Sequence, residues 1–396
     1  MPSDPNTPTP LSLPILLADE SLRPREFPVC QRKIFLAHAA VCPLPHRVAE
    51  AVATYARQAT LDDQEQPVLA SLTRDVRELA ARLIGALPHE IALVGPTSLG
   101  LSFVAAGFPF RRGDNIVIYF EDYPSNVYPW MALADRGVEV RLVHTQGLGR
   151  LTTRDVMAQV DENTRLAALA SCHFISGWRL NLPELHAELS RRRVALCVDG
   201  IQTLGAFPTL AQHADFIAAD AHKWMLGPCG AGFLYVNRAW HETLRPVVYG
   251  WNNVRCPDFV ARETITFRSG AHRYEAGSHS MLGLAGLRAA LGLILELGVD
   301  PIATELLRKR SWLVPALQEQ GWEVAGADAP PPHQSGIVSI TRPDLDLAAL
   351  QQQLAAEGVV VSLRTERSGR RHLRLSPHAY TTDAELRRAV GLLKPR

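Results

Sequence analysis

The sequence has almost no net charge. Its 41 lysines and arginines stand against 40 aspartates and glutamates, which leaves a formal charge of +1. A chain without a global field has little to attract nucleic acid or an anionic membrane surface, so neither is expected as a partner. The sequence also lacks an uncharged apolar run of about 18 residues, the length that a membrane-spanning helix requires. Its N-terminus lacks the basic and apolar regions of a signal peptide, and a cytoplasmic protein is therefore expected.

The cysteines lack the spacing of a metal site or of a redox pair. Zinc ligands and C-x-x-C motifs place cysteines a few residues apart. The six cysteines of this chain are instead scattered: Cys30, Cys42, Cys172, Cys197, Cys229 and Cys256. We therefore expect reduced thiols and no bound metal.

The remaining composition is that of a folded protein with two domains. At 396 residues the chain exceeds the usual size of one domain, and 47% hydrophobic with 20% charged residues argues against disorder beyond the ends. Residues 1–28 are rich in proline and have few periodic apolar positions, which predicts a poorly ordered or extended N-terminal arm. Apolar residues recur at helical spacing over 45–59 and 69–87, and both segments are predicted to be helices.

From Ile91 onward, short apolar runs rich in β-formers alternate with helical stretches. The runs are residues 91–94, 115–120, 138–143, 165–170, 194–198, 216–219 and 232–236. This alternation predicts an α/β fold with a mostly parallel, seven-stranded sheet that helices cover on both faces. Ligands of such sheets bind outside the carboxyl ends of the strands, so the residues that follow each run are the candidate site residues.

The pattern changes beyond residue 272. Strands are expected among helices at 336–341, 359–363 and 372–375, which indicates a smaller α+β domain. We therefore divide the chain into an N-terminal arm (1–28), a large domain (29–272) and a small C-terminal domain (273–396).

Two neighbouring runs end in charged residues. The run 216–219 continues to Lys223 and a glycine-rich loop. Because lysine is costly to bury, Lys223 is either a solvated charge or a group that faces a ligand. The preceding run delivers Asp199, which is either the N-cap of a helix or a carboxylate that must be paired, bind a metal or face a cavity. Consecutive parallel strands tend to be neighbours, so both side chains are expected to open into one crevice.

Four further positions each have a functional and a structural interpretation. The turn at 95–100, ahead of an apolar helix, is either a phosphate site or an ordinary helix cap. Tyr123 either stacks on a flat ring or belongs to the core, and His173 either contacts a ligand or is a satisfied buried histidine. Arg374 alternates with two leucines, so it faces either a cleft, where it can bind a carboxylate, or solvent.

Four segments together resemble the class V aminotransferases, a branch of the fold-type I pyridoxal-phosphate (PLP) enzymes that includes cysteine desulfurases, isopenicillin N epimerase-like proteins and kynureninases. The segments are Val198-Asp199-Gly200-Ile201-Gln202, Ala221-His222-Lys223-Trp224, Arg273-Tyr274-Glu275-Ala276-Gly277 and Leu373-Arg374-Leu375-Ser376-Pro377-His378. The resemblance runs from about residue 34 to residue 393, and the joint order and spacing are far more specific than any one motif. It implies the PLP-dependent transferase fold type I and PLP as the cofactor.

The resemblance implies a role for each matching position around the cofactor ring. Lys223 would hold PLP as a Schiff base and then move the Cα proton of the substrate. Asp199 would keep the pyridine nitrogen protonated, because an opposite charge in a low-dielectric site favours the protonated form. Gln202 would hydrogen-bond the phenolate oxygen of the cofactor, and Tyr123 would stack over the ring.

The resemblance also implies how the phosphate and the substrate are held. Thr97 and Ser98 would bind the phosphate with help from His222, and Ser278 would reach it from the neighbouring subunit. This implies a homodimer with a shared active site. Arg374 would bind the α-carboxylate, which identifies the substrate as an amino acid.

Two departures from the family pattern shape the expected function. Cysteine desulfurases carry a nucleophilic cysteine ahead of the carboxylate arginine, and residues 361–374 contain none. We therefore expect a PLP-dependent C–S lyase that works by β-elimination, or an aminotransferase, and not a persulfide-forming cysteine desulfurase. An amino-acid epimerase and a non-catalytic relative that binds a carboxylate ligand or a partner protein are the alternatives. Asp220 stands where relatives place a phosphate-binding serine, so it is expected to turn away or to hydrogen-bond through an intermediary. His38 and Arg364 receive no role.

Overall fold

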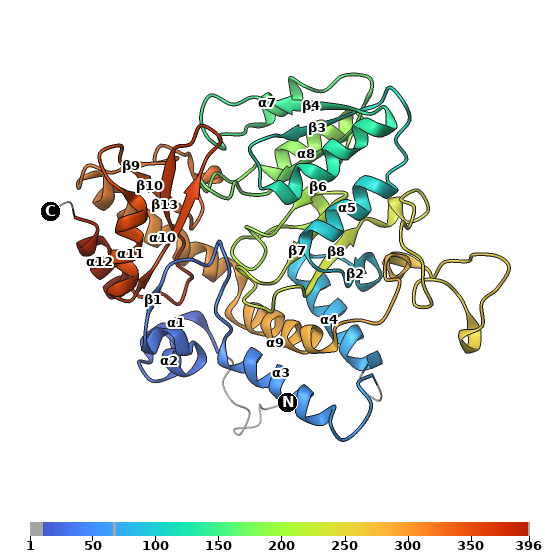
Figure 1. Cartoon of the computed structure of the whole chain (residues 1–396), viewed down its shortest axis with the longest axis horizontal. Coiled ribbons are helices and arrows are strands. Elements are labelled where there is room, and N and C mark those ends of the chain that lie inside the picture. Colours follow the sequence, from blue (N-terminus) through green and yellow to red (C-terminus); the bar gives the residue numbers. More distant parts are fainter. Residues whose placement is uncertain (1–10, 66–68, 395–396) are drawn as a thin grey trace, which may run out of the picture.

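The computed structural model describes residues 11–65 and 69–394. A seven-stranded sheet forms the centre of its larger lobe, in the order β2-β8-β7-β6-β5-β3-β4 (Figure 1). The strands are β2 (Ile91–Ala92), β3 (Asn115–Tyr119), β4 (Glu139–Val143), β5 (Thr164–Ala170), β6 (Ala195–Asp199), β7 (Phe216–Asp220) and β8 (Gly232–Val236). Only the β2–β8 and β7–β8 pairs of this sheet are antiparallel. The predicted mostly parallel α/β sheet is confirmed.

The inner strands of the sheet are mostly apolar because both faces of the sheet are covered. Successive residues of β7 enter different apolar clusters: Phe216 packs with α5 (Thr97–Gly107), and Ile217 packs with α8 (Leu182–Arg191) on the other face. Every residue of β3, β6, β7 and β8 is buried. This is the pattern of a parallel sheet between two helical layers.

Three helices pack along the lower edge of the large lobe. They are α3 (His46–Gln58), α4 (Leu69–Ile84) and α9 (Met281–Leu297), and the first two confirm the helices predicted there. Although α9 follows the predicted boundary at residue 273, its buried face belongs to the apolar cluster of the large sheet. The division of the chain into domains at residue 273 stays a prediction. By its packing, α9 belongs to the large lobe.

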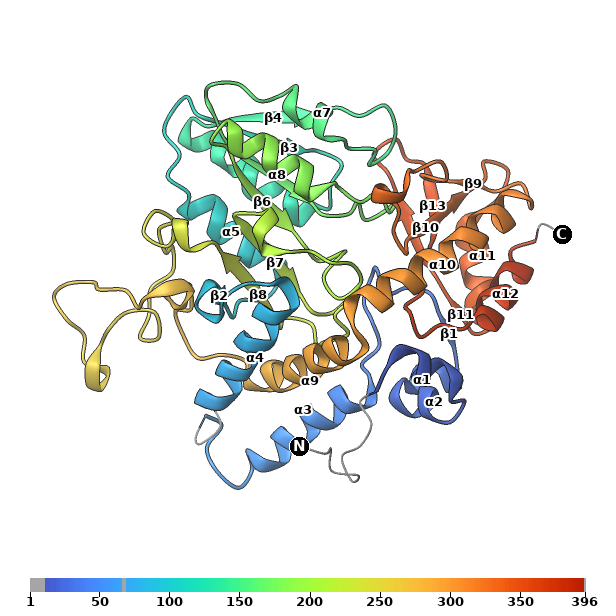
Figure 2. The ribbon, with the colours of Figure 1, turned by 180° about the vertical axis from the view of Figure 1, so that it is seen from behind.

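The smaller lobe is built on an antiparallel sheet in the order β12-β13-β10-β9. Its strands are β9 (Glu323–Val324), β10 (Val338–Thr341), β12 (Ser362–Thr365) and β13 (Arg371–Leu375), and its helices are α10 (Val299–Gln318), α11 (Leu347–Ala356) and α12 (Asp383–Leu392). Figure 2 shows α10 continuing from α9 into this lobe. No single helix in the described part of the chain is long and apolar enough to cross a membrane, and α9 and α10 meet that test only as a pair bent by 72°.

The N-terminal segment differs from the prediction. Residues 11–28 are not an extended arm: they form α1 (Leu13–Ala18) and α2 (Leu22–Glu26), while residues 1–10 lie outside the described residues. Tertiary contacts hold these short helices, because Phe27 stacks on Tyr380 with ring centroids 3.8 Å apart. The chain then pairs β1 (Ile34–Phe35) with β11 (Val359–Val360) of the small lobe before it enters α3.

Candidate active site

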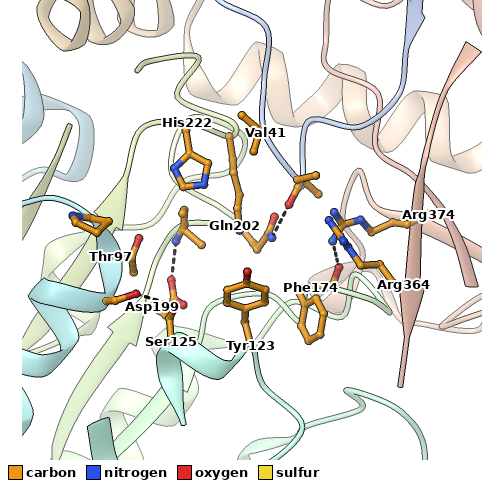
Figure 3. Close-up of a pocket in the computed structure, with 16 residues that line it drawn as sticks. Val41, Thr97, Tyr123, Ser125, Phe174, Asp199, Gln202, His222, Arg364 and Arg374 are labelled. Carbon is orange, nitrogen blue, oxygen red and sulfur yellow. Dashed lines mark hydrogen bonds between the residues drawn. The ribbon is translucent and has the colours of Figure 1, made fainter. Parts of the chain in front are cut away.

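A cavity of about 290 Å³ opens at the carboxyl ends of the central strands (Figure 3). The turns after β3, β6 and β7, the N-terminus of α5 and the β12–β13 hairpin of the small lobe contribute to its walls. All predicted site residues except Ser278 line it: Thr97, Ser98, Tyr123, Asp199, Gln202, His222, Lys223 and Arg374. The fold therefore brings together candidate residues from both lobes.

Lys223 and Asp199 lie at the ends of adjacent strands and are both buried, with exposed fractions of 7% and 3%. Burial lowers the pKa of Lys223 to about 8, and the charge of Asp199 acts in the opposite direction. Burial also raises the pKa of the Asp199 carboxyl, which the lysine charge opposes. Near neutral pH a part of the lysine is therefore the neutral amine, which is the nucleophilic form. The geometry favours the ligand-facing interpretation of both residues over a solvated lysine and a plain helix cap.

Gln202 and Tyr123 border the lysine. The Gln202 amide donates to the carbonyl of Ala39 at 3.0 Å and accepts from the Trp224 indole at 2.9 Å. One amide N–H remains for a ligand, since the group has two donor hydrogens. Tyr123 is 47% exposed, and its ring centre lies 5.3 Å from Lys223 Nζ. A half-exposed ring that faces the cavity favours the stacking interpretation over a core aromatic.

The N-terminus of α5 faces the cavity with two hydroxyl residues. The N-cap is Pro96, which makes no side-chain cap bond. Ser98 donates to Ser125 at 2.8 Å, and the Thr97 hydroxyl accepts the Asp220 N–H at 2.9 Å. The free N–H groups of the first turn are therefore left for an anion.

Asp220 turns away from the cavity, as expected. Its carboxylate accepts the N–H groups of Ala221 at 2.7 Å and Gly230 at 2.9 Å, and it lies 3.0 Å from His222 Nδ1. These partners hold the negative charge behind the histidine, so it does not point at the helix N-terminus.

Arg374 extends from β13 into the opposite wall and is 1% exposed. It donates to the carbonyl of Phe174, whereas its Nε and Nη2 have no hydrogen-bond partner. Burial and, to a smaller extent, the charge of Arg364 lower its pKa to about 9. A buried guanidinium with free donors is costly unless an anion binds it, which favours the cleft interpretation over the solvent one.

The two candidate histidines are satisfied by the protein. His173 contacts the Glu121 carbonyl and the Ser176 hydroxyl, each at 3.0 Å, so the structural interpretation is the better one. His38 lies behind the cavity, 2.7 Å from the Tyr380 hydroxyl. Burial lowers the pKa of both imidazoles, which keeps them neutral.

Several cavity residues were not singled out from the sequence. Ser125 and Phe174 contact predicted residues, whereas Arg364, which the sequence singles out without a role, joins Arg374 in the wall. Asp122 lies close behind Asp199, and its carboxylate accepts N–H groups of Asn126 and Ala170 at 3.1 and 3.0 Å. Burial raises its pKa to about 7. Its position directly after β3 was the available signal, because the strand-end rule applies to Asp122 as it does to Tyr123.

Ser278 lies in a second cavity, with Gly95, Gly230 and His279. The segment that carries it is fixed by Glu275, a buried carboxylate that binds the Arg77 guanidinium and the Leu93 N–H and lies 2.9 Å from His279 Nε2. Ser278 itself is exposed and outside the main cavity. Its contact with a neighbouring subunit stays a prediction.

The groups in the main cavity fit a flat, phosphorylated pyridine aldehyde. They comprise a partly neutral amine, a carboxylate beside it, an exposed aromatic ring and a helix N-terminus with free N–H groups. The unpartnered guanidinium of Arg374 then remains for a second molecule with an acid group.

The chain is similar to known proteins over most of its length. A sequence model of the family Aminotransferase class-V matches residues 34–388. A probable cysteine desulfurase of Methanothermobacter thermautotrophicus is 29% identical over 295 residues, which are 73% of each chain. A cysteine desulfurase of Salmonella typhimurium is 29% identical over 295 residues, 70% of this chain and 72% of the relative.

Solved structures share the fold at lower identity. The apo cysteine desulfurase of Thermococcus onnurineus NA1 has a TM-score of 0.85 at 23% identity, over 93% of this chain and 95% of that one. The cystine C–S lyase C-DES, in complex with its product cysteine persulfide, has a TM-score of 0.84 at 22% identity, over 92% and 98%.

These findings correct the function expected from the sequence. The choice of a β-eliminating C–S lyase or an aminotransferase rested on excluding a persulfide-forming cysteine desulfurase, and that exclusion is wrong. Curated relatives bear the name cysteine desulfurase, so the missing cysteine in residues 361–374 is no ground for excluding that class.

Proposed function

Because the chain belongs to the class-V aminotransferase family, we propose that it is a PLP-dependent enzyme that removes the sulfur atom of cysteine and passes it on as a persulfide. The family uses PLP. The observation that carries the proposal is the cavity in which a buried lysine, a buried carboxylate and an unpartnered arginine converge. Together with the names of the curated relatives, it favours cysteine as the amino-acid substrate.

The proposed reaction balances with one acceptor thiol. The bond between Cβ and sulfur of cysteine breaks, a bond forms between that sulfur and the acceptor sulfur, and the proton of the acceptor thiol ends on carbon. Cysteine and a thiol thus give alanine and a persulfide. Bound PLP supplies the electron sink that makes the carbon atoms next to the amino group reactive.

The residues of the chain divide the remaining tasks. Arg374 binds the α-carboxylate and so fixes the orientation of the Cα–H bond. Lys223 is the amine that binds the cofactor and then takes and returns protons, for which its lowered pKa of about 8 suits it. Asp199 supplies the negative charge that keeps a ring nitrogen protonated, and Tyr123 covers the lysine side of the cavity.

Capture of PLP by the cofactor-free protein is expected to depend on pH through Lys223. Only the neutral amine attacks an aldehyde, and burial lowers the pKa of this amine from 10.5 to about 8. The initial rate should therefore rise with pH around 8 and level off above it. Visible absorbance after rapid mixing with PLP, from about pH 6 to pH 10, measures this rate.

Asp199→Asn is the matched control for that profile. The Asp199 charge raises the pKa of the lysine, so the variant should shift the midpoint to lower pH. A midpoint near the ordinary value for lysine would contradict the assignment of Lys223 as the capturing amine.

We also propose a homodimer in which Ser278 completes the site of the partner subunit. Supporting this, Ser278 lies outside the main cavity of its own chain, on a segment where Glu275 contacts Leu93 and His279. The α5 N-terminus, whose N-cap Pro96 makes no side-chain cap bond, leaves N–H donors free that a phosphate would need.

Mixed dimers test this arrangement. Lys223→Ala and Ser278→Asp homodimers should both be inactive, the second because a carboxylate repels phosphate. Co-expression should restore partial activity, because one site of the mixed dimer then has both an intact lysine and an intact serine from the other subunit. Alanine formation by the purified mixed dimer is the measurement. If Ser278 acted within its own subunit, neither site would be complete and no activity would return.

A further inference from the structure

We propose that the sulfur acceptor is a small diffusible thiol that carries a carboxylate, and that Arg364 binds this carboxylate at the mouth of the cavity. The inference rests on the function proposed above. It identifies the acceptor thiol of that reaction, which the chain itself does not supply.

The first step is the position of the enzyme's own thiols. All six cysteines fall within the described residues, and none of them lines the cavity. Cys42, Cys172 and Cys197 are buried, and burial raises the pKa of Cys42 to about 12 and of Cys172 to about 11. A thiol held in its neutral form is a poor nucleophile. The exposed Cys229 lies on the loop beyond Met225, outside the cavity wall.

The second step is the hairpin between β12 and β13. Only residues 366–370 join the two strands, and the Glu366 N–H donates to the Arg370 carbonyl at 3.0 Å. The tip is held against the large lobe, where Arg367 lies 4.2 Å from the centre of the Phe120 ring. This short turn contains no cysteine, so it brings no thiol into the cavity.

The third step is the register of that hairpin. Ser362 pairs with Arg374, so Arg364, two residues further along β12, lies on the same face as Arg374 and diagonally across from it. The alternate pair, Leu363 and Leu373, points to the apolar core of the small lobe. Both arginines therefore face the cavity, as Figure 3 shows.

The fourth step is the charge balance at this wall. The Arg364 Nε is buried without a partner, and its Nη1 reaches only the carbonyl of Leu363 at 3.4 Å. Asp199 is the one carboxylate among the lining residues, and its charge acts on Lys223. Two guanidinium groups on one face repel each other, and burial followed by this repulsion lowers the pKa of Arg374. The single α-carboxylate of the amino acid pairs with Arg374, and Arg364 is then left without an anion.

The fifth step is how deeply each of the two arginines is buried. Arg374 is fully buried, whereas Arg364 is half-buried and therefore lies nearer to solvent. The amino acid binds first at Arg374, and a thiol that arrives from solvent meets Arg364. A nearby positive charge also stabilises the thiolate, which attacks the cysteine sulfur as the bond to Cβ breaks. The products are alanine and the persulfide of the small thiol.

A matched pair of thiols tests the proposal on the PLP-loaded enzyme. At a cysteine concentration well below that of the added thiol, we expect kcat/KM for 3-mercaptopropionate to exceed that for 3-mercaptopropionamide by about tenfold. Arg364→Gln should abolish the preference: the value for the acid should fall by more than the value for the amide, until the two are equal. Arg364→Lys should keep a part of the preference. Alanine and the alkylated small-molecule persulfide are quantified by mass spectrometry.

Two control variants accompany this test. Arg367→Gln removes a charge from the same hairpin outside the cavity, and Cys229→Ser removes the exposed thiol; both should keep the tenfold preference. Equal use of acid and amide by the wild type, or a persulfide on a cysteine of the enzyme itself, would overturn the inference while leaving sulfur removal intact. Absence of alanine with every thiol would overturn the proposed function and the inference with it.

Discussion

Replacement of Lys223 by alanine is expected to abolish both the visible absorbance of the PLP-loaded protein and the formation of alanine from cysteine. The side chain is the only lysine in the wall of the described cavity, and it combines capture of the cofactor with proton transfer. Loss of both tasks should lower kcat by about 10⁴-fold or more. Absorbance after dialysis and mass spectrometry of the products measure the two effects.

Lys309→Arg is the matched control for this variant. Lys309 is also a buried lysine, but it pairs with Glu305 and the Ala379 carbonyl, away from the cavity. Arginine keeps the charge and removes the primary amine, so colour and activity should persist. A Lys223→Ala protein that retains its colour after dialysis would show that another amine binds the cofactor.

Replacement of Arg374 by glutamine is expected to raise the KM for cysteine without changing the colour of the enzyme. Truncating one partner of a buried, hydrogen-bonded charge pair costs roughly 2–5 kcal/mol, or about 30-fold or more in affinity. The folded protein itself should tolerate the change, because the guanidinium has unpartnered nitrogens that glutamine does not bury. Spectral titration and steady-state kinetics measure the effect.

Cysteamine, which is cysteine without its carboxylate, is the control ligand. The wild type should bind cysteine more tightly than cysteamine, and Arg374→Gln should bind the two alike. A variant that still prefers cysteine by the same factor would place the carboxylate site elsewhere, and a loss of visible absorbance would mean that Arg374 supports the cofactor instead.

The large sheet was predictable because its strands are buried on both faces. Such strands appear as continuous apolar runs, and the residues after them converge by topology, so the sequence alone predicts that Asp199 and Lys223 lie together. The short elements were not predictable. β1 and β9 have two residues each, and α1 and α2 depend on contacts such as that of Phe27 with Tyr380, far away in the sequence.

Neither the placement of Arg364 in the cavity nor the reaction could be predicted from the sequence, and the physical reasons differ. Arg364 faces the cavity only because Ser362 pairs with Arg374, and strand register in a hairpin depends on turn geometry. The error about persulfide chemistry came from treating one loop as the only source of a thiol. The absence of a cysteine from that loop does not exclude an acceptor thiol that arrives from solvent.

The segment between β1 and α3 links the two lobes mechanically. β1 is paired with β11 of the small lobe, and α3 is packed against α9 of the large one, so the intervening residues 36–45 span the boundary beside the second crossing at α9 and α10. Ala39, within this span, lines the cavity and accepts the Gln202 amide. A displacement of the small lobe would therefore be transmitted through residues 36–45 to the Ala39 carbonyl, and so to the orientation of Gln202 in the cavity.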